Sequence, residues 1–114
     1  MAKKIKWFRV TADISSLDFA ENNIAVTECN GKTICIGKHN EQLFAFAYKC
    51  PHASGILANG YIDPIGNIVC PVHRYKFSLA NGRNSEGYYL KTYPVESRED
   101  GIYAGFEESG FSLW

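Results

Sequence analysis

Two short motifs, each with one cysteine and one histidine, constrain the fold of this chain more than any other feature. They are Cys50-Pro51-His52 and Cys70-Pro71-Val72-His73, and seventeen residues separate them. Each motif offers one thiolate and one imidazole, which are common metal ligands. The intervening segment contains the turn-forming residues Gly55, Gly60, Pro64 and Gly66. The chain can therefore leave the first loop and return, so that the two loops face each other.

Outside these motifs the sequence is typical of an all-β protein. Short runs of β-branched and aromatic residues alternate with Gly, Asn and Asp, and no ten-residue segment has a clean helical period. We interpret Asp13–Phe19 as a loop with one turn of helix. Many short strands with frequent turns predict a small sandwich or barrel. The predicted strands are Lys6–Val10, Ile24–Cys29, Lys32–Gly37, Leu43–Tyr48, Gly60–Asp63, Asn67–Val69, Lys76–Leu79, Lys91–Ser97 and Ile102–Glu107.

Two further cysteines flank the Asn30-Gly31 pair, which is a strong signal for a two-residue hairpin. In that register Cys29 lies opposite Lys32, and Cys35 lies opposite Val26. The two cysteines then point to opposite faces of the sheet, so they cannot form a disulfide. We interpret both as small, buried or half-buried apolar residues. A redox or ligand role is the alternative.

Composition and charge narrow the class of protein. The chain has 114 residues, 46% of them hydrophobic and 21% charged, which favours one globular domain. Its formal net charge is zero, so it has no overall basic signature for nucleic acid. Neither a signal peptide nor a membrane span is recognisable, and we expect a cytoplasmic protein. Thiols stay reduced there, so metal binding or catalysis is favoured over disulfides.

The mixed composition of the two motifs bears on the kind of metal site. Structural zinc sites usually pair cysteine with cysteine and histidine with histidine. Here each motif is mixed, which fits a binuclear cluster better, with both sulfurs on one metal ion and both nitrogens on a second. Two other interpretations stay open, namely a single zinc ion and core cysteines with incidental histidines.

The double motif resembles that of the Rieske [2Fe–2S] proteins, in which histidines replace two cysteines on one iron. The residues that carry the resemblance are Cys50-Pro51-His52, Cys70-Pro71-Val72-His73, Phe77, Gly82 and, more loosely, Leu90 and Tyr93-Pro94-Val95. The resemblance implies one Rieske domain over residues 1–114 with an antiparallel β-sandwich or barrel. The base sandwich would comprise about residues 1–48 and 79–114, and a small cluster-binding subdomain about residues 49–78.

The resemblance also implies a ligand set and one [2Fe–2S] cluster. Cys50 and Cys70 would bind the inner iron, and His52 and His73 would bind the outer iron through Nδ1. Two ferric ions, two sulfides and two thiolates sum to a neutral oxidised site, whereas four thiolates would leave it doubly negative. An electron is added more easily to the neutral site, which explains why histidine ligation raises the reduction potential.

The same resemblance implies an electron carrier rather than an enzyme. Terminal oxygenases of this type need a second iron held by two histidines and a carboxylate. Only His39 remains after His52 and His73 are assigned, and we interpret it as a solvated loop residue. We expect a soluble one-electron carrier between a reductase and a terminal oxygenase or similar acceptor, with no nucleic-acid or membrane partner. The alternatives are a small subunit of a larger reductase, such as an assimilatory nitrite reductase, and a zinc-stabilised interaction module.

Two local features bear on partners. Arg74 and Lys76 flank the second loop, and we interpret them as solvated charges, with steering of a partner as the alternative. Gly87-Tyr88 stands where many relatives have Gly-Pro. Because proline fixes φ, this loop is expected to be less rigid than theirs.

Departures from the high-potential members predict a low reduction potential. Those members carry one more cysteine in each loop, and the two form a disulfide; the matching residues here are Gly55 and Val72. Their serine and tyrosine, which donate hydrogen bonds to sulfur, correspond here to Tyr75 and Phe77. Loss of such bonds removes stabilisation of the added electron. A redox titration should give a midpoint below about 0 mV, and a midpoint near +300 mV would contradict this prediction.

Overall fold

Antiparallel strands are the main secondary structure in a computed structural model that describes residues 4–51 and 55–107. The strands are β1 (Ile5–Thr11), β2 (Ile24–Cys29), β3 (Lys32–His39), β4 (Gln42–Ala47), β5 (Tyr61–Ile62), β6 (Asn67–Val69), β7 (Lys76–Ser78), β8 (Thr92–Tyr93), β9 (Val95–Arg98) and β10 (Gly101–Glu107). Two short 3-10 turns, η1 (Ile14–Ser16) and η2 (Leu57–Asn59), interrupt them. The predicted all-β class is confirmed. No helix in the described part of the chain is long and apolar enough to span a membrane.

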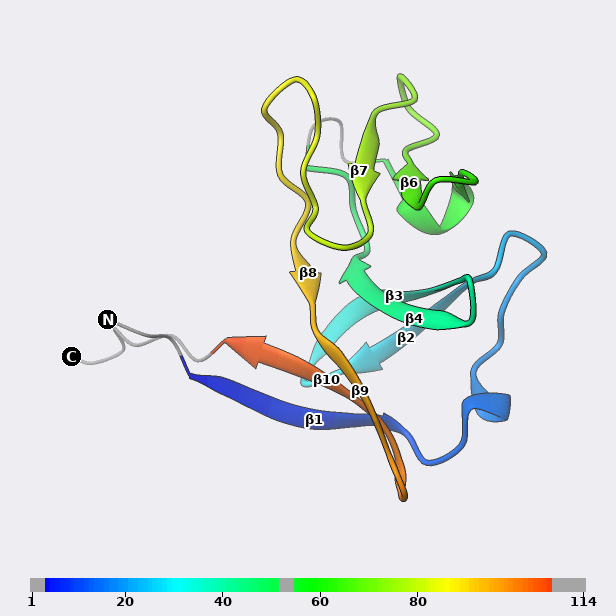
Figure 1. Cartoon of the computed structure of the whole chain (residues 1–114), viewed down its shortest axis with the longest axis vertical. Helices are drawn as coiled ribbons and strands as arrows, with labels where there is room; N and C mark the ends of the chain where they lie inside the picture. Colours follow the sequence, from blue (N-terminus) through cyan, green and yellow to red (C-terminus); the bar gives the residue numbers. More distant parts are fainter. Residues whose placement is uncertain (1–3, 52–54, 108–114) are drawn as a thin grey trace.

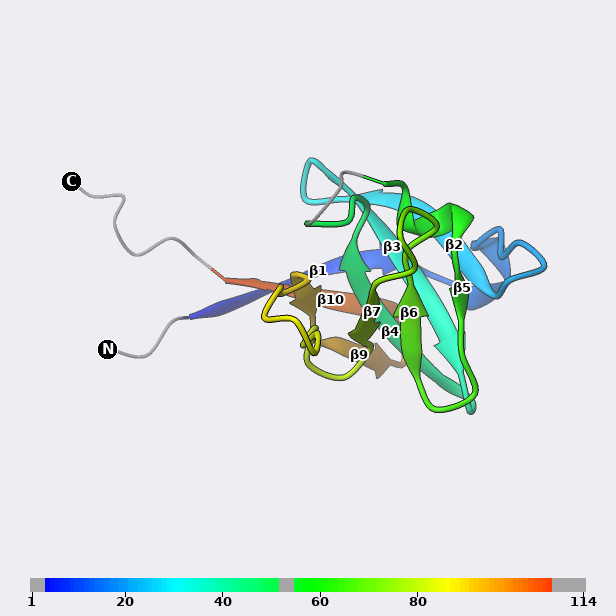
Figure 2. The ribbon, with the colours of Figure 1, turned by 90° about the horizontal axis from the view of Figure 1, so that it is seen from above.

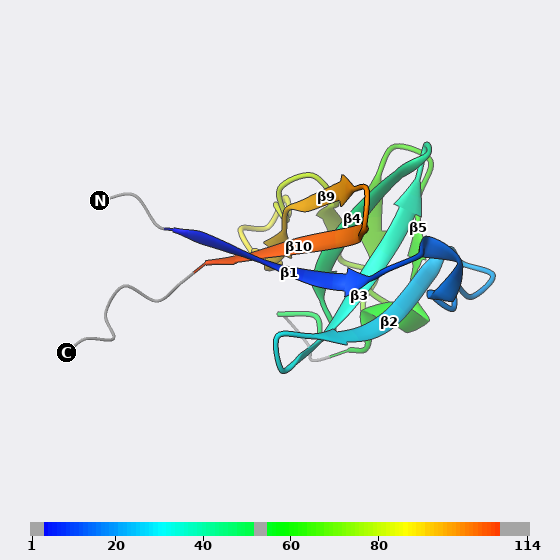
Figure 3. The ribbon, with the colours of Figure 1, turned by 90° about the horizontal axis from the view of Figure 1, so that it is seen from below.

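The strands form three sheets, with the orders β1-β10-β9, β2-β3-β4-β8 and β5-β6-β7. Figure 1 places the β5-β6-β7 sheet at one end of the molecule, above the other two. In Figure 2 this small sheet lies over one face of β3 and β4, and Figure 3 shows β1 and β10 crossing the opposite face. The β2-β3-β4-β8 sheet is therefore the middle layer of the molecule.

Two hydrophobic cores lie on the two faces of that middle sheet. Ile34 and Ile36 of β3 pack with Phe106 in one core, whereas Cys35 between them packs with Phe46 and the small sheet in the other. Successive side chains of a strand alternate between its faces, so a strand buried on both faces needs an unbroken apolar run. The Ile34–Ile36 run meets that need, with all three residues fully buried.

The β2–β3 hairpin confirms the predicted register. Cys29 pairs with Lys32, and Val26 pairs with Cys35. Asn30 and Gly31 both have positive φ, as a two-residue hairpin of this kind requires. Cys29 and Cys35 belong to different cores and are both free thiols, so they do indeed lie on opposite faces. Burial raises the pKa of Cys35 to about 12, which keeps this thiol protonated and inert.

Most predicted strands agree with the structure to within about two residues, and η1 lies inside the predicted loop Asp13–Phe19. The predicted strand Lys91–Ser97 is instead divided into β8 and β9, which belong to different sheets. The division falls at Pro94, which has no N–H to donate; its carbonyl accepts from the Gly105 N–H at 2.8 Å. The chain thus passes from the middle sheet to the outer sheet at this proline.

The interpretation of His39 as a solvated loop residue was wrong. His39 ends β3, pairs with Gln42 and is only partly exposed. Its ring lies against the β5–β6 turn, because a Cβ placed on Gly66 would be 3.6 Å from two ring atoms. The turn is Asn40-Glu41, both with positive φ. Because the turn has only two residues, the hairpin is longer than predicted and His39 belongs to β3. Its side chain there contacts the small sheet.

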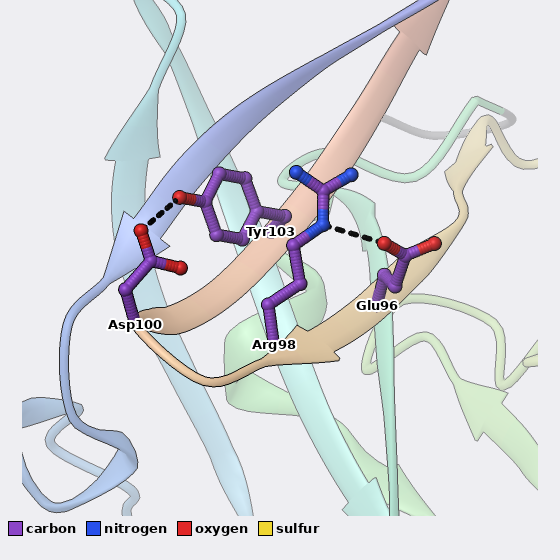
Figure 4. Close-up of polar contacts among 4 residues, drawn as sticks. All are labelled: Glu96, Arg98, Asp100 and Tyr103. Carbon is purple, nitrogen blue, oxygen red and sulfur yellow. Dashed lines mark hydrogen bonds and ion pairs between the residues drawn. The ribbon is translucent and has the colours of Figure 1, made fainter.

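The outer face of the β9–β10 hairpin carries a cluster of polar contacts far from the cysteine–histidine loops (Figures 1 and 4). The Arg98 guanidinium lies 4.2 Å from the Tyr103 ring centroid and 5.5 Å from that of Trp7, and it is paired with Glu96. The Tyr103 hydroxyl donates to Asp100 at 2.8 Å. Cation–π contacts and exposed ion pairs of this kind each add a modest amount to stability. Their role here is to order the edge strand β9.

The segment between β7 and β8, the yellow loop in Figure 1, is attached to the small sheet through Gly82. The Gly82 N–H donates to the Ser78 carbonyl at 2.7 Å, and its carbonyl accepts from the Leu90 N–H at 2.9 Å. A Cβ on Gly82 would lie 1.9 Å from the Leu90 carbonyl oxygen, whereas one on Gly87 would meet nothing within 4 Å. Both glycines have positive φ.

The two glycines give a matched test of this attachment. Gly87→Ala should cost about 1–2 kcal/mol of unfolding free energy, because only the backbone conformation opposes a side chain there. Gly82→Ala should cost about 3 kcal/mol or more, because the Leu90 backbone must also move. Urea unfolding measures both values. Equal losses in the two variants would show that close backbone approach at Gly82 is unimportant.

Candidate metal centre

The two cysteine–histidine loops are built in the same way. Cys50 follows β4, and its N–H donates to the Gly55 carbonyl at 2.8 Å. Cys70 directly follows β6, and its N–H donates to the Tyr75 carbonyl, also at 2.8 Å. Each loop thus begins at a cysteine and is closed by a backbone hydrogen bond to the fifth residue after it. The two bonds fix the start of the first loop after β4 of the middle sheet and the start of the second loop after β6 of the small sheet.

Cys50 and Cys70 are brought together inside the core. They are 2% and 0% exposed, belong to the same buried cluster, and are both free thiols. Burial raises the pKa of Cys70, a hydrogen bond from the Val72 N–H opposes that rise, and the neighbouring Cys50 side chain raises the pKa further. Two adjacent buried sulfurs with a backbone N–H directed at one of them suit a metal that prefers soft thiolate ligands. The residues present therefore fit a metal centre.

His73 lies on the outside of the same loop. It is exposed, and it has a φ of 61°, followed by Arg74 with 56°. Two consecutive non-glycine residues in the left-handed region are unusual, and such backbone strain is concentrated at functional sites. The loop thus keeps its thiol inside and presents its imidazole at the surface. The other predicted ligand, His52, lies outside the described residues.

The two loops touch each other at the positions where high-potential Rieske proteins carry additional cysteines. A Cβ on Gly55 would lie 2.8 Å from Val72 Cγ2 and 3.0 Å from Cys70 Sγ. The matching positions are therefore neighbours in space, joined by packing of Val72 over the glycine. The first loop can approach the Cys70 sulfur this closely because Gly55 has no side chain.

Among residues 4–51 and 55–107, no three His, Cys, Asp or Glu side chains gather as a metal site. Of the predicted site residues, the structure joins Cys50 to Cys70 and places His73 on the loop that Cys70 begins. Cys29 lies in the other core and His39 against the β5–β6 turn, whereas Cys35 belongs to the same buried cluster as Cys50 and Cys70.

Aromatic residues beside His73 form a feature that sequence reasoning missed. The His73 and Tyr75 ring centroids are 6.5 Å apart, and those of Tyr75 and Tyr88 are 5.3 Å apart. Twelve residues separate the two tyrosines, and neither strand period nor motif spacing relates them. The departure from Gly-Pro at Gly87-Tyr88 was the one available signal. Phe77, in contrast, is fully buried in the core.

A small cleft lies beside the second cysteine–histidine loop. It has a volume of about 230 Å³ and is lined by His73, Arg74, Tyr75, Lys76, Ser85 and Glu86. Arg74 and Lys76 are exposed. The cleft beside the exposed imidazole is therefore lined by two cationic side chains, Arg74 and Lys76, and by one carboxylate, Glu86 of the β7–β8 segment.

Asp63 holds the β5–β6 turn, which returns the chain to the second loop. Its carboxylate accepts from the Asn67 N–H at 2.8 Å, the Ile65 N–H at 3.2 Å and the Asn67 side-chain amide at 3.1 Å. Burial alone would raise the pKa of Asp63. The hydrogen bonds from Asn67 and Ile65 and the charge of Lys76 outweigh burial, so the pKa is lowered.

Comparison with known proteins gives one family and several relatives. The family model described as the Rieske [2Fe-2S] domain matches residues 7–94. The chain is 28% identical over 78 residues to a 3-phenylpropionate/cinnamic acid dioxygenase ferredoxin subunit of Photorhabdus laumondii, covering 66% of this chain and 74% of that one. It is 32% identical over 98 residues to a nitrite reductase [NAD(P)H] of Emericella nidulans, covering 73% of this chain and 9% of that enzyme.

A solved structure shows the same fold. It is a chain from the complex of reduced oxygenase and oxidized ferredoxin in carbazole 1,9a-dioxygenase. The TM-score is 0.71 at 23% identity, and the match covers 90% of this chain and 95% of that one.

The Asp63 contacts predict a pH-dependent loss of stability on substitution. A carboxyl whose pKa is lowered by folding contributes stability above its unfolded pKa, and this stability is lost as the pH falls through the folded pKa. At pH 7, Asp63→Ala should cost about 1–3 kcal/mol, because backbone N–H groups lose their acceptor. The difference from the unmodified protein should shrink below the ordinary pKa of 3.8.

Urea unfolding at pH 7 and pH 3 measures this difference. Asp18→Ala, which removes an exposed carboxyl, serves as the control and should change little at either pH. A loss for Asp63→Ala that is the same at both pH values would contradict a role for the charged carboxylate.

Proposed function

The chain belongs to the Rieske [2Fe–2S] domain family, and from this premise we propose that it carries single electrons from a reductase to a terminal oxygenase or similar acceptor. The observation that carries the proposal is the pair of matched loops, which bury two neighbouring thiols beneath an exposed imidazole. The relative from Photorhabdus laumondii, named as the ferredoxin subunit of a dioxygenase, supports the same role.

Four residues are assigned as ligands of one [2Fe–2S] cluster in this proposal. Cys50 and Cys70 hold the inner iron, and His52 and His73 hold the outer iron. The burial and adjacency of the two thiols and the exposure of His73 support this division. Residues of about 49–78 act as the cluster-binding subdomain on a base of about residues 1–48 and 79–114.

Each part of the chain has a distinct task in electron transfer. A bound cluster supplies a centre that gains and loses one electron. The apolar core around Cys50 and Cys70 excludes water from the sulfurs, and the Val72 N–H stabilises negative charge on the Cys70 sulfur. His73 brings the site to the surface, where a partner can approach. Arg74 and Lys76 offer local positive charge to that partner, whereas the formal net charge of the whole chain is zero.

The chain itself performs no chemistry on a substrate in this proposal; the acceptor does. Encounters between redox proteins are typically small and short-lived, which suits a carrier that must leave one partner for another. We also place the protein in the cytoplasm, where reducing conditions keep cysteines outside the proposed ligand set, Cys29 and Cys35, as thiols.

Delivery of electrons to a nitrite reductase is the second candidate. The match to the Emericella nidulans enzyme favours it, because 98 residues align at 32% identity with only 9% of that much longer chain. This chain would then be a separate small subunit that serves the same task as the aligned segment.

Reconstitution with purified partners distinguishes these functions. With NADH, a Rieske-type reductase and a terminal oxygenase, substrate oxidation should require this protein and be lost without it. Cys50→Ala and Cys70→Ala should lose both this activity and the bound iron. Cys29→Ala, which changes a buried cysteine in the other core, serves as the matched control and should retain both.

Two results would redirect the proposal. Electron delivery to the large subunit of a nitrite reductase, with none to an oxygenase, would favour the second candidate. Oxidation of a substrate by this protein alone would contradict the role of a carrier.

A further inference from the structure

Three aromatic rings connect the second cysteine–histidine loop to the β7–β8 segment. The His73 and Tyr75 rings are 6.5 Å apart and inclined by 59°, and the Tyr75 and Tyr88 rings are 5.3 Å apart and inclined by 50°. These distances are typical of favourable aromatic pairs. Tyr88 comes from the β7–β8 segment, next to the Arg83–Tyr89 bridge, so this segment packs against the second cysteine–histidine loop.

Tyr75 is the residue through which this packing reaches the site. Its carbonyl accepts the N–H of Cys70 at 2.8 Å and thereby closes the loop. Its ring lies between His73 and Tyr88. A residue that packs against Tyr75 therefore restrains the loop that carries both Cys70 and His73.

The surroundings of the Tyr75 hydroxyl agree with this placement. Burial raises the pKa of Tyr75, and so do the charges of Tyr88 and Glu86, a hydrogen bond with the Tyr88 side chain, and the charge of Cys50. The hydroxyl thus remains neutral. Tyr88, whose ring packs on that of Tyr75, is itself 38% exposed.

We propose that Tyr88 is a positioning residue that holds in place Tyr75, the residue that closes the second cysteine–histidine loop, and keeps water from this side of the metal site. The inference rests on the proposed function. Reduction adds one negative charge to the site, and water near that charge stabilises it. The two rings replace water with apolar surface, so their packing lowers the reduction potential of the protein and slows opening of the loop.

Three variants separate ring packing from other effects. Tyr88→Ala removes the ring and the hydroxyl, and Tyr88→Phe removes the hydroxyl alone. Tyr89→Ala is the matched control, because Tyr89 is the next residue, is 57% exposed, and has no ring contact with Tyr75 among those found in the described residues. Both sites are exposed and lie in a loop, so the three variants should fold.

The midpoint potential of the cluster-loaded protein is the first measurement. Loss of an aromatic pair changes an equilibrium by about three- to tenfold. Tyr88→Ala should therefore raise the midpoint by about 30–60 mV, at 59 mV per tenfold for one electron. Tyr88→Phe and Tyr89→Ala should stay within error of the unmodified protein.

Hydrogen exchange of the Cys70 amide is the second measurement, and it does not depend on redox activity. Because Tyr75 accepts this hydrogen bond, Tyr88→Ala should speed exchange by about three- to tenfold, whereas Tyr89→Ala should not. Unchanged potential and exchange in Tyr88→Ala, or equal changes in Tyr89→Ala, would overturn the inference. A protein that binds no iron at all would instead overturn the proposed function, so the two failures are distinguishable.

Discussion

The contact between two buried thiols, Cys50 and Cys70, is the constraint on which the rest of this structure depends. Cys70 gains little from burial beside Cys50, because a thiol is a weak hydrogen-bonding group and burial raises the pKa of Cys70. The pair is nevertheless held by two loops with the same backbone closure. The proposed metal centre would explain this arrangement, since a bound metal ion stabilises thiolates.

The layered fold is what brings these loops together. β3 is buried on both faces, so one sheet serves two cores and supports the small sheet above it. The first loop follows β4 of the middle sheet, and the second follows β6 of the small sheet. Their meeting point is therefore set by the packing between these two sheets, and the close approach of Gly55 to Cys70 completes it.

The features of the fold that depend on neighbouring residues could be predicted from the sequence. The Asn30-Gly31 pair predicts the register of the hairpin, and this register places Cys29 and Cys35 on opposite faces of the sheet. Contacts between distant segments were not predictable in this way. The change of sheet at Pro94 depends on which strands pair with β8 and with β9. The contact of His39 with Gly66 depends on how the middle sheet and the small sheet pack together. The packing of Tyr75 on Tyr88 likewise joins segments that no sequence period relates.

The central claim is that Cys50, Cys70 and their histidine neighbours hold a [2Fe–2S] cluster rather than another metal. Iron and acid-labile sulfide analysis of the purified protein, combined with an electron paramagnetic resonance spectrum after reduction, tests it most directly. We expect a red-brown protein with two irons and two sulfides per chain and a signal that appears on one-electron reduction. A colourless protein that contains one zinc ion per chain and gives no signal would contradict the account.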